Sequence, residues 1–350
     1  MNFGLAPDEV SGGKGYTEPF HQREAVADAI VNKLQNPHII ALQEVAGDFE
    51  VSADGTVSAS LNMQKLISSI RVAGGPQYRY AEVAPTNLAD GGRPGANIRC
   101  GFLYRPDRVS LYETSSKAGP TTAASITTVD GKPHLSAGNP VRIDPENKAF
   151  RNSRKAIVGE FIDQKTGETY FISNLHLTAR MRGHRAENAG LSEIAQQKAN
   201  ERRTQQRVDQ VSTVTQFNEG LLNHIANNDS ARSKIHVVAL GDFNASLNES
   251  NDPSKSSAPE PVLHTMEKSG MHRACADFNR RHHYSAPTIH EEDTKDTVDH
   301  IFVSPELEKR IGKVKRTNLI DTNGTPAASD HNPTVININP EKFLSLSAAR

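Results

Sequence analysis

The sequence predicts one large α/β domain, with two layered sheets and helices on the outside. Apolar segments of helical spacing and of strand length alternate along its 350 residues. The length alone is compatible with two domains, but no change of composition divides the chain. Because each sheet and each helix must bury one apolar face, helices packed outside paired sheets form one stable unit. We therefore expect a single domain.

The elements follow from the apolar spacing in chain order. Apolar residues three to four apart predict helices over residues 26–34 and 61–70, and the polar segment 187–227 predicts one long helix or two consecutive helices. Stretches 115–147 and 248–261, rich in Ser, Thr, Gly, Asn and Pro, are predicted to be loops. Short apolar runs predict strands at residues 38–42, 78–83, 98–104, 109–113, 156–162, 170–177, 236–240, 297–303, 314–320 and 333–338.

Composition narrows the classes of function. Hydrophobic residues make up 36% of the chain, which supports a core and excludes a globally disordered protein. The 40 Lys+Arg and 41 Asp+Glu give a net charge of -1, so any site for a polyanion must be a local patch. Two cysteines, Cys100 and Cys275, are too few for a disulfide scaffold, and they either pair or remain buried thiols.

The sequence gives little evidence on localisation. It contains no run of 18 apolar residues, so no membrane span is expected. The first residues lack the basic start, apolar stretch and cleavage site of a secretory signal. The chain as given is therefore expected to be cytoplasmic, processed or truncated.

Polar residues at the ends of apolar strands are the candidates for chemistry, because strand interiors rarely tolerate unpaired charge. Each one alone is more typical of a loop cap or a salt bridge. As a set at strand ends they indicate a site, and carboxylates without thiolates favour a hard cation such as Mg²⁺. A bound metal beside His and Asn suits hydrolysis of a phosphate ester. The candidates are Glu44, His176, Asp242, Asn244, Asp299 and the run Ser329-Asp330-His331.

The order of these motifs resembles the endonuclease/exonuclease/phosphatase superfamily. The matching series is Gln43-Glu44, the strand ending in His176, Gly241-Asp242-Phe243-Asn244, Asp299 and Ser329-Asp330-His331. Segment 98–109 also resembles a strand of deoxyribonuclease I and of bacterial extracellular nucleases. The resemblance implies a four-layered α/β sandwich of two mixed sheets, with a single domain over residues 1–343 and a tail over 344–350.

The resemblance also implies roles for the residues. Glu44 would bind the metal, with Asp330 as a second or supporting ligand. Asp242 would orient or deprotonate the attacking water, and Asn244 would help to hold the phosphate. His331 would contact the scissile phosphate or transfer a proton, with its ring fixed by Asp299. The implied cation is Mg²⁺, which Mn²⁺ or Ca²⁺ could replace.

Three further positions follow from the deoxyribonuclease branch. His176 stands where that branch has a second histidine. Arg154 matches an arginine that contacts phosphate there, although a solvated strand start is the alternative. Asn2 would end the first strand near the metal and contact substrate, in which case most of that strand is missing or truncated.

The proposed substrate is a nucleic acid. Segment 180–207 carries seven Lys/Arg against three Glu, and segment 280–284 (Arg-Arg-His-His-Tyr) is a second basic candidate. With no Trp in the chain, backbone contact with a duplex is favoured over base stacking. The alternative for each basic segment is a solvated face. The members of the first patch are Arg180, Arg182, Arg185, Lys198, Arg202, Arg203 and Arg207, opposed by Glu187, Glu193 and Glu201.

The sequence therefore predicts a metal-dependent phosphodiesterase, a non-specific endonuclease acting on DNA or RNA and leaving 5′-phosphate ends. The alternatives are a phosphatase or phospholipid phosphodiesterase of the same superfamily, or an inactive binding protein of this fold. We expect a monomer. Resemblance to extracellular nucleases suggests secretion or a periplasmic location.

Overall fold

The computed structural model describes residues 19–48, 50–91, 97–180, 190–227, 234–246, 260–274, 297–317, 319, 328–329 and 331–339. Its small sheet has the order β1-β3-β2, and its large sheet has the order β11-β12-β10-β9-β8-β4, with β7 also paired to β8. The described strands of the small sheet are β1 (Ile39–Val45), β2 (Arg79–Glu82) and β3 (Arg99–Tyr104). Those of the large sheet are β4 (Val109–Leu111), β7 (Val141–Arg142), β8 (Ile157–Asp163), β9 (Thr169–His176), β10 (Ile235–Asp242), β11 (His272–Arg273) and β12 (Asp299–Val303).

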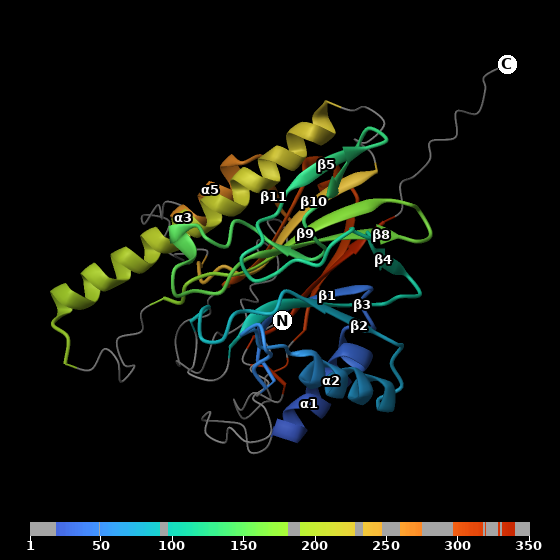
Figure 1. The fold of residues 1–350 in the computed structure, drawn as a ribbon, viewed down its shortest axis with the longest axis horizontal. Coiled ribbons are helices and arrows are strands. Elements are labelled where there is room, and N and C mark those ends of the chain that lie inside the picture. The colour runs from blue at the N-terminus through green and yellow to red at the C-terminus, as the bar shows by residue number, and fades with distance from the viewer. Residues whose placement is uncertain are drawn as a thin grey trace.

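The two sheets face each other and carry helices on their outer sides (Figure 1). Helix α1 (Pro19–Asp28), continued by η1 (Ala29–Lys33), and helix α2 (Ser60–Val72) lie beside the small sheet. Helices α3 (Glu193–Ala226) and α5 (Pro261–Lys268) cover the large sheet. The predicted four-layered α/β sandwich is confirmed. Mixed pairing occurs in the large sheet, where β9 and β10 run parallel, whereas the described pairs of the small sheet are antiparallel.

Alternation along β3 divides the apolar residues between two cores. Cys100, Phe102 and Tyr104 pack in the core that includes the large sheet, whereas Leu103 packs with the helices of the small sheet. Successive side chains of a strand point to opposite faces, so one strand supplies both cores. Cys100 is a free thiol, and burial raises its pKa to about 12. Cys275 and segment 280–284 lie outside the described residues.

Some elements differ from the sequence-based expectations. Segment 115–147 contains β5 (Ile126–Val129), β6 (Lys132–Leu135) and β7, and buried Leu135 and Val141 pack in the larger core, so the prediction of a surface loop was wrong there. Short helices α5 and α7 (Pro305–Glu308) were not predicted. The long helix is continuous from Glu193 to Ala226. A short pair, β13 (Ile311–Arg316) and β14 (Thr334–Ile338), follows. No described helix is long and apolar enough to cross a membrane.

A pair of buried amides joins the two sheets. Gln43 of β1 and Asn174 of β9 are both completely buried, and Gln43 Nε2 donates to Asn174 Oδ1 over 2.6 Å. The Asn174 amide in turn donates to the carbonyl oxygens of Leu42 at 3.0 Å and Gly101 at 2.9 Å. Because buried polar groups are costly when unpaired, this network favours one position of β1 against β9.

Asn174→Ala should lower the free energy of unfolding by roughly 2–5 kcal/mol, because it removes three hydrogen bonds made in the buried interior, to Gln43 and to the carbonyl oxygens of Leu42 and Gly101. Urea denaturation would measure the loss. Asn32→Ala is the matched control, since Asn32 is exposed and makes one side-chain bond to Asp28. Its effect should stay within about 0.5 kcal/mol. Equal effects of the two substitutions would contradict a structural role for the amide pair.

Gly241 permits the close approach of β10 to β9. Its φ is +136°, and a Cβ added there would collide with the carbonyl oxygen of Leu175. Gly241→Ala should therefore destabilise the protein by about 2 kcal/mol or more. Gly220→Ala is the control, since Gly220 lies in helix α3 with open space around it and alanine there should stabilise by about 0.5–1 kcal/mol. Thermal unfolding of both variants tests the opposite signs.

Candidate active site

Three predicted site residues meet at the ends of adjacent strands in the large sheet. In the β9–β10 pair Asp242 lies opposite His176, and in the β10–β12 pair Asp242 lies opposite Asp299. Each of these residues is the first or last of its strand. The strand register alone therefore places one histidine and two carboxylates side by side.

Glu44 reaches the same place from the small sheet. Its backbone has a positive φ of 56°, and the pairing of β1 with β3 shifts between Leu42 and Val45. His176 Nε2 lies 3.7 Å from Glu44 Oε1 and also 3.7 Å from Asp242 Oδ2. The side chain of Glu44 is 35% exposed, whereas those of His176 and Asp242 are 4% exposed. The accessible carboxylate of this group is thus Glu44.

His176 is neutral in this environment. Burial lowers the pKa of His176 well below its usual value, and the nearby Arg154 lowers it further, against the opposing effect of Asp242. Its Nδ1 atom is buried and has no hydrogen-bond partner among the described residues. A neutral imidazole keeps one nitrogen as donor and one as acceptor, which a proton-transfer or phosphate-contact group requires.

A second histidine forms a dyad with Asp299. His331 Nδ1 lies 2.7 Å from Asp299 Oδ2, and the backbone N–H of His331 donates to Ser329 Oγ at 3.1 Å. Burial favours the neutral acid, but the adjacent His331 outweighs it, and the pKa of Asp299 is lowered. An ionised Asp299 holds the ring with Nε2 directed away from it, the arrangement of a base and its orienting group.

Asn244 and Arg154 converge on the carbonyl oxygen of Leu177, the residue after His176. Asn244 Nδ2 donates to it at 3.2 Å, and Arg154 Nη2 donates to it at 2.8 Å. The backbone N–H of Asn244 also donates to Asp242 Oδ1 at 2.8 Å. These bonds hold an amide and a guanidinium beside the carboxylates. Burial lowers the pKa of Arg154, and Glu44 and Asp242 oppose this effect.

The donor set fits a hard cation. The described residues contain no cluster of three His, Cys, Asp or Glu side chains arranged to hold a metal. Glu44 and Asp242 nevertheless bring two carboxylates to one histidine, and oxygen ligands are those that Mg²⁺ and Ca²⁺ prefer. A cation at Glu44 would leave coordination positions for water and substrate.

The structure brings together seven of the nine predicted site residues. The other two, Asn2 and Asp330, lie outside the described residues. Sequence reasoning did not assign Asn174 or Gly241 a place in the site, although Asn174 stands out as an amide inside an apolar strand. The functional roles remain predictions.

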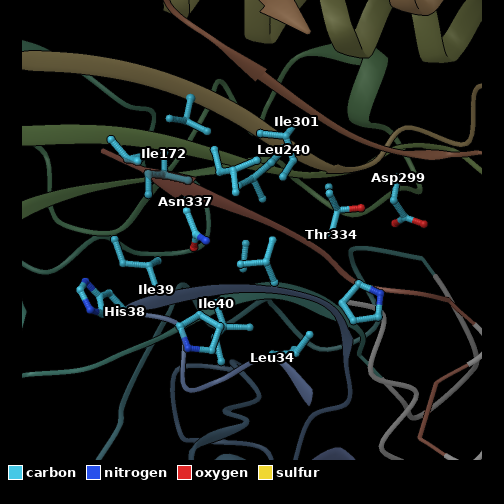
Figure 2. A pocket seen from close by; sticks show the side chains of 18 of the residues that line it. Leu34, His38, Ile39, Ile40, Ile172, Leu240, Asp299, Ile301, Thr334 and Asn337 are labelled. Atoms are coloured by element: carbon cyan, nitrogen blue, oxygen red, sulfur yellow. The ribbon is translucent and has the colours of Figure 1, made fainter. Parts of the chain in front are cut away.

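A cavity of about 560 Å³ is lined by β1 of the small sheet, by β9, β10 and β12 of the large sheet and by β14, and it reaches the dyad. Figure 2 shows Asp299 at one end and His38 at the other, with aliphatic side chains such as Ile172 and Leu240 between them. The Asp299–His331 dyad therefore lines one end of this cavity, and His38 and Asp163 line the other.

The solved structures that match this chain share little sequence with it. The catalytic domain of human Nocturnin, with bound sulfate, is 15% identical, with a TM-score of 0.47 over 91% of this chain and 87% of that one. A humanized D. rerio TDP2 is 14% identical, with a TM-score of 0.48 over 97% of both chains. A 3′ phosphatase from Neisseria, NExo, bound to a product DNA hairpin, is 13% identical, with a TM-score of 0.46 over 90% of this chain and 93% of that one.

Comparison with curated proteins gave no significant match. The sequence model of the Endonuclease/Exonuclease/phosphatase family, in contrast, matches residues 10–331, which include all the candidate site residues except Asn2. The chain belongs to the Endonuclease/Exonuclease/phosphatase family.

Proposed function

We propose that this protein is a metal-dependent phosphodiesterase, and specifically a non-specific endonuclease that cuts the DNA or RNA backbone and leaves 5′-phosphate ends. Its family consists of hydrolases that act on phosphoester bonds and generally depend on a divalent metal. The finer assignment rests on the residues gathered at the site.

The observation that carries the proposal is the convergence of two sheets on one histidine. Glu44 comes from the small sheet and Asp242 from the large one, each 3.7 Å from His176 Nε2. Asp299, which pairs with His331, lies on β12 directly opposite Asp242 of β10. Phosphodiester hydrolysis requires carboxylates that bind a cation, groups that transfer protons and groups that bind the phosphate. The site offers all three, with two histidines available for proton transfer.

In this mechanism Asp242 orients or deprotonates the attacking water. Asn244 and Arg154 hold the phosphate, with their positions set by the Leu177 carbonyl. His331 contacts the scissile phosphate or transfers a proton, and Asp299 keeps its ring oriented. Each of these groups acts on the phosphate or on water from a fixed position, so little rearrangement is needed during the reaction.

Glu44 would hold the cation, with Asp330 as a second or supporting ligand. When bound, Mg²⁺, or Mn²⁺ or Ca²⁺ in its place, would neutralise charge on the phosphate in the transition state. The partial exposure of Glu44 fits this role, since substrate oxygen must reach the same cation.

The metal requirement can be tested on supercoiled plasmid. Nicking should occur with Mg²⁺, stop with a chelator, and return when Mg²⁺ is restored. The new ends should carry 5′-phosphates, which ligation without kinase treatment would detect. Absence of nicking, together with release of inorganic phosphate from an end-phosphorylated oligonucleotide, would instead indicate a phosphatase and would refute the endonuclease proposal.

Asp242→Ala and His331→Ala should each reduce kcat by roughly 10²–10⁴-fold, the usual contribution of a positioned proton-transfer group. The expected loss assumes unchanged folding, which circular dichroism would check. Asp209→Ala and His224→Ala are the controls, since both residues are exposed on helix α3. Full activity in either site variant would remove that residue from the mechanism.

A further inference from the structure

Helix α3 differs between its two halves. All of its buried residues lie from Arg207 onward, and the first part, residues 193–206, contributes none. These fourteen positions span about 21 Å at 1.5 Å per residue. Figure 1 shows this end of α3 extending beyond the sheets and beyond α5. We call residues 193–206 the arm.

The base of the arm is fixed to the loop that follows His176. Gln210 Oε1 accepts a hydrogen bond from the backbone N–H of Thr178 at 2.9 Å, and Arg207 Nη1 donates to the Thr178 carbonyl at 3.4 Å. Gln206 Nε2 donates to the carbonyl oxygens of Ala149 at 3.1 Å and Arg151 at 3.2 Å. The arm therefore starts at the rim of the candidate site.

Charges on the arm are separated by face. One face carries Lys198, Arg202 and Gln206, which are spaced four residues apart. Gln206 contacts the segment around Ala149. Glu193 and Glu201 share another face with Gln197, which donates to Glu201 Oε1 at 3.0 Å. The first face thus presents Lys198 and Arg202, and Glu193 and Glu201 lie on the neighbouring face, with Glu201 three residues from Lys198 at the boundary between the two.

The face of the arm that carries Glu193 and Glu201 is on the same side of α3 as helix α5. Thr204, one turn beyond Glu201, accepts from Arg207 Nη2 at 2.9 Å, and the same Arg207 atom lies 3.6 Å from Glu260, next to α5. Arg207 is almost fully buried, so it does not contribute to the exposed basic patch in which the sequence placed it. Arg182 and Arg185 of that patch lie outside the described residues.

Two cations continue the basic face toward the site. Arg203 Nη1 donates to the carbonyl of Ala179 at 3.5 Å, and Arg180 Nη1 donates to Ser246 Oγ at 3.1 Å, two residues beyond Asn244. The neighbouring segment 144–151 is neutral, since Lys148 and Arg151 balance Asp144 and Glu146. The positive excess therefore comes from the arm and from Arg180.

We propose that the arm is a docking surface for the sugar–phosphate backbone of a duplex nucleic acid, to one side of the bond that is cleaved. The proposal rests on the proposed nuclease function. A reach of about 21 Å corresponds to roughly six base pairs at 3.4 Å each. Cations on a rigid helix contact phosphates without reading bases, so the added affinity is independent of sequence and sensitive to salt.

The test is the double variant Lys198→Gln/Arg202→Gln, in which glutamine keeps the helix propensity and removes two charges. Binding of a duplex of about 30 base pairs is measured by fluorescence anisotropy in chelator, where no turnover occurs. The variant should bind several-fold more weakly, and the slope of log affinity against log salt should become shallower by about two. The control is Lys165→Gln/Lys234→Gln. Both lysines are exposed and precede the first residues of β9 and β10, whereas the candidate site lies where these strands end.

Activity separates this proposal from the proposed function. With Mg²⁺, the variant should keep the wild-type rate on a small phosphodiester such as bis(p-nitrophenyl) phosphate and show a raised KM on the duplex. Unchanged duplex affinity and salt slope would overturn the role of the arm, even if the enzyme nicks plasmid. Failure of the wild type to nick plasmid would overturn the nuclease proposal, while the binding measurement would still decide the role of the arm.

Discussion

The hydrogen bond between Gln43 and Asn174 is the constraint on which the site depends. The candidate site is built from two sheets that share no backbone hydrogen bonds in the described pairings, so side chains must set their relative position. Gln43 directly precedes Glu44, and Asn174 lies two residues before His176. Fixing the two amides in the interior therefore also fixes the carboxylate and the imidazole at the edge.

The strand register provides the second constraint. Parallel pairing of β9 with β10 and antiparallel pairing of β10 with β12 place His176, Asp242 and Asp299 in one row. Gly241 allows this close spacing, because a side chain there would collide with the neighbouring strand. Packing and chemistry are coupled at this edge of the sheet, since the same backbone positions that form the core also position the reactive groups.

Burial then gives similar side chains different properties. His176 is enclosed near Arg154, so the imidazole stays neutral, whereas His331 is held by an ionised Asp299. Among the carboxylates, Glu44 is accessible and Asp242 is enclosed. One site can therefore contain a cation ligand, a water-orienting group and two distinct histidines. The basic arm of α3 begins at the same rim.

The sequence by itself determined the elements with strong periodicity, such as the helix predicted at residues 61–70 and found at Ser60–Val72, and the residue types at the strand ends, because apolar spacing and isolated charges are local signals. It did not reveal strands β5 to β7, whose polar, Gly-rich surroundings are typical of loops. Only the tertiary structure decided which strand ends meet, that Asn174 faces Gln43, and that Arg207 is buried while Arg202 is exposed. Those outcomes depend on register and on contacts between residues far apart in the chain, which no local pattern encodes.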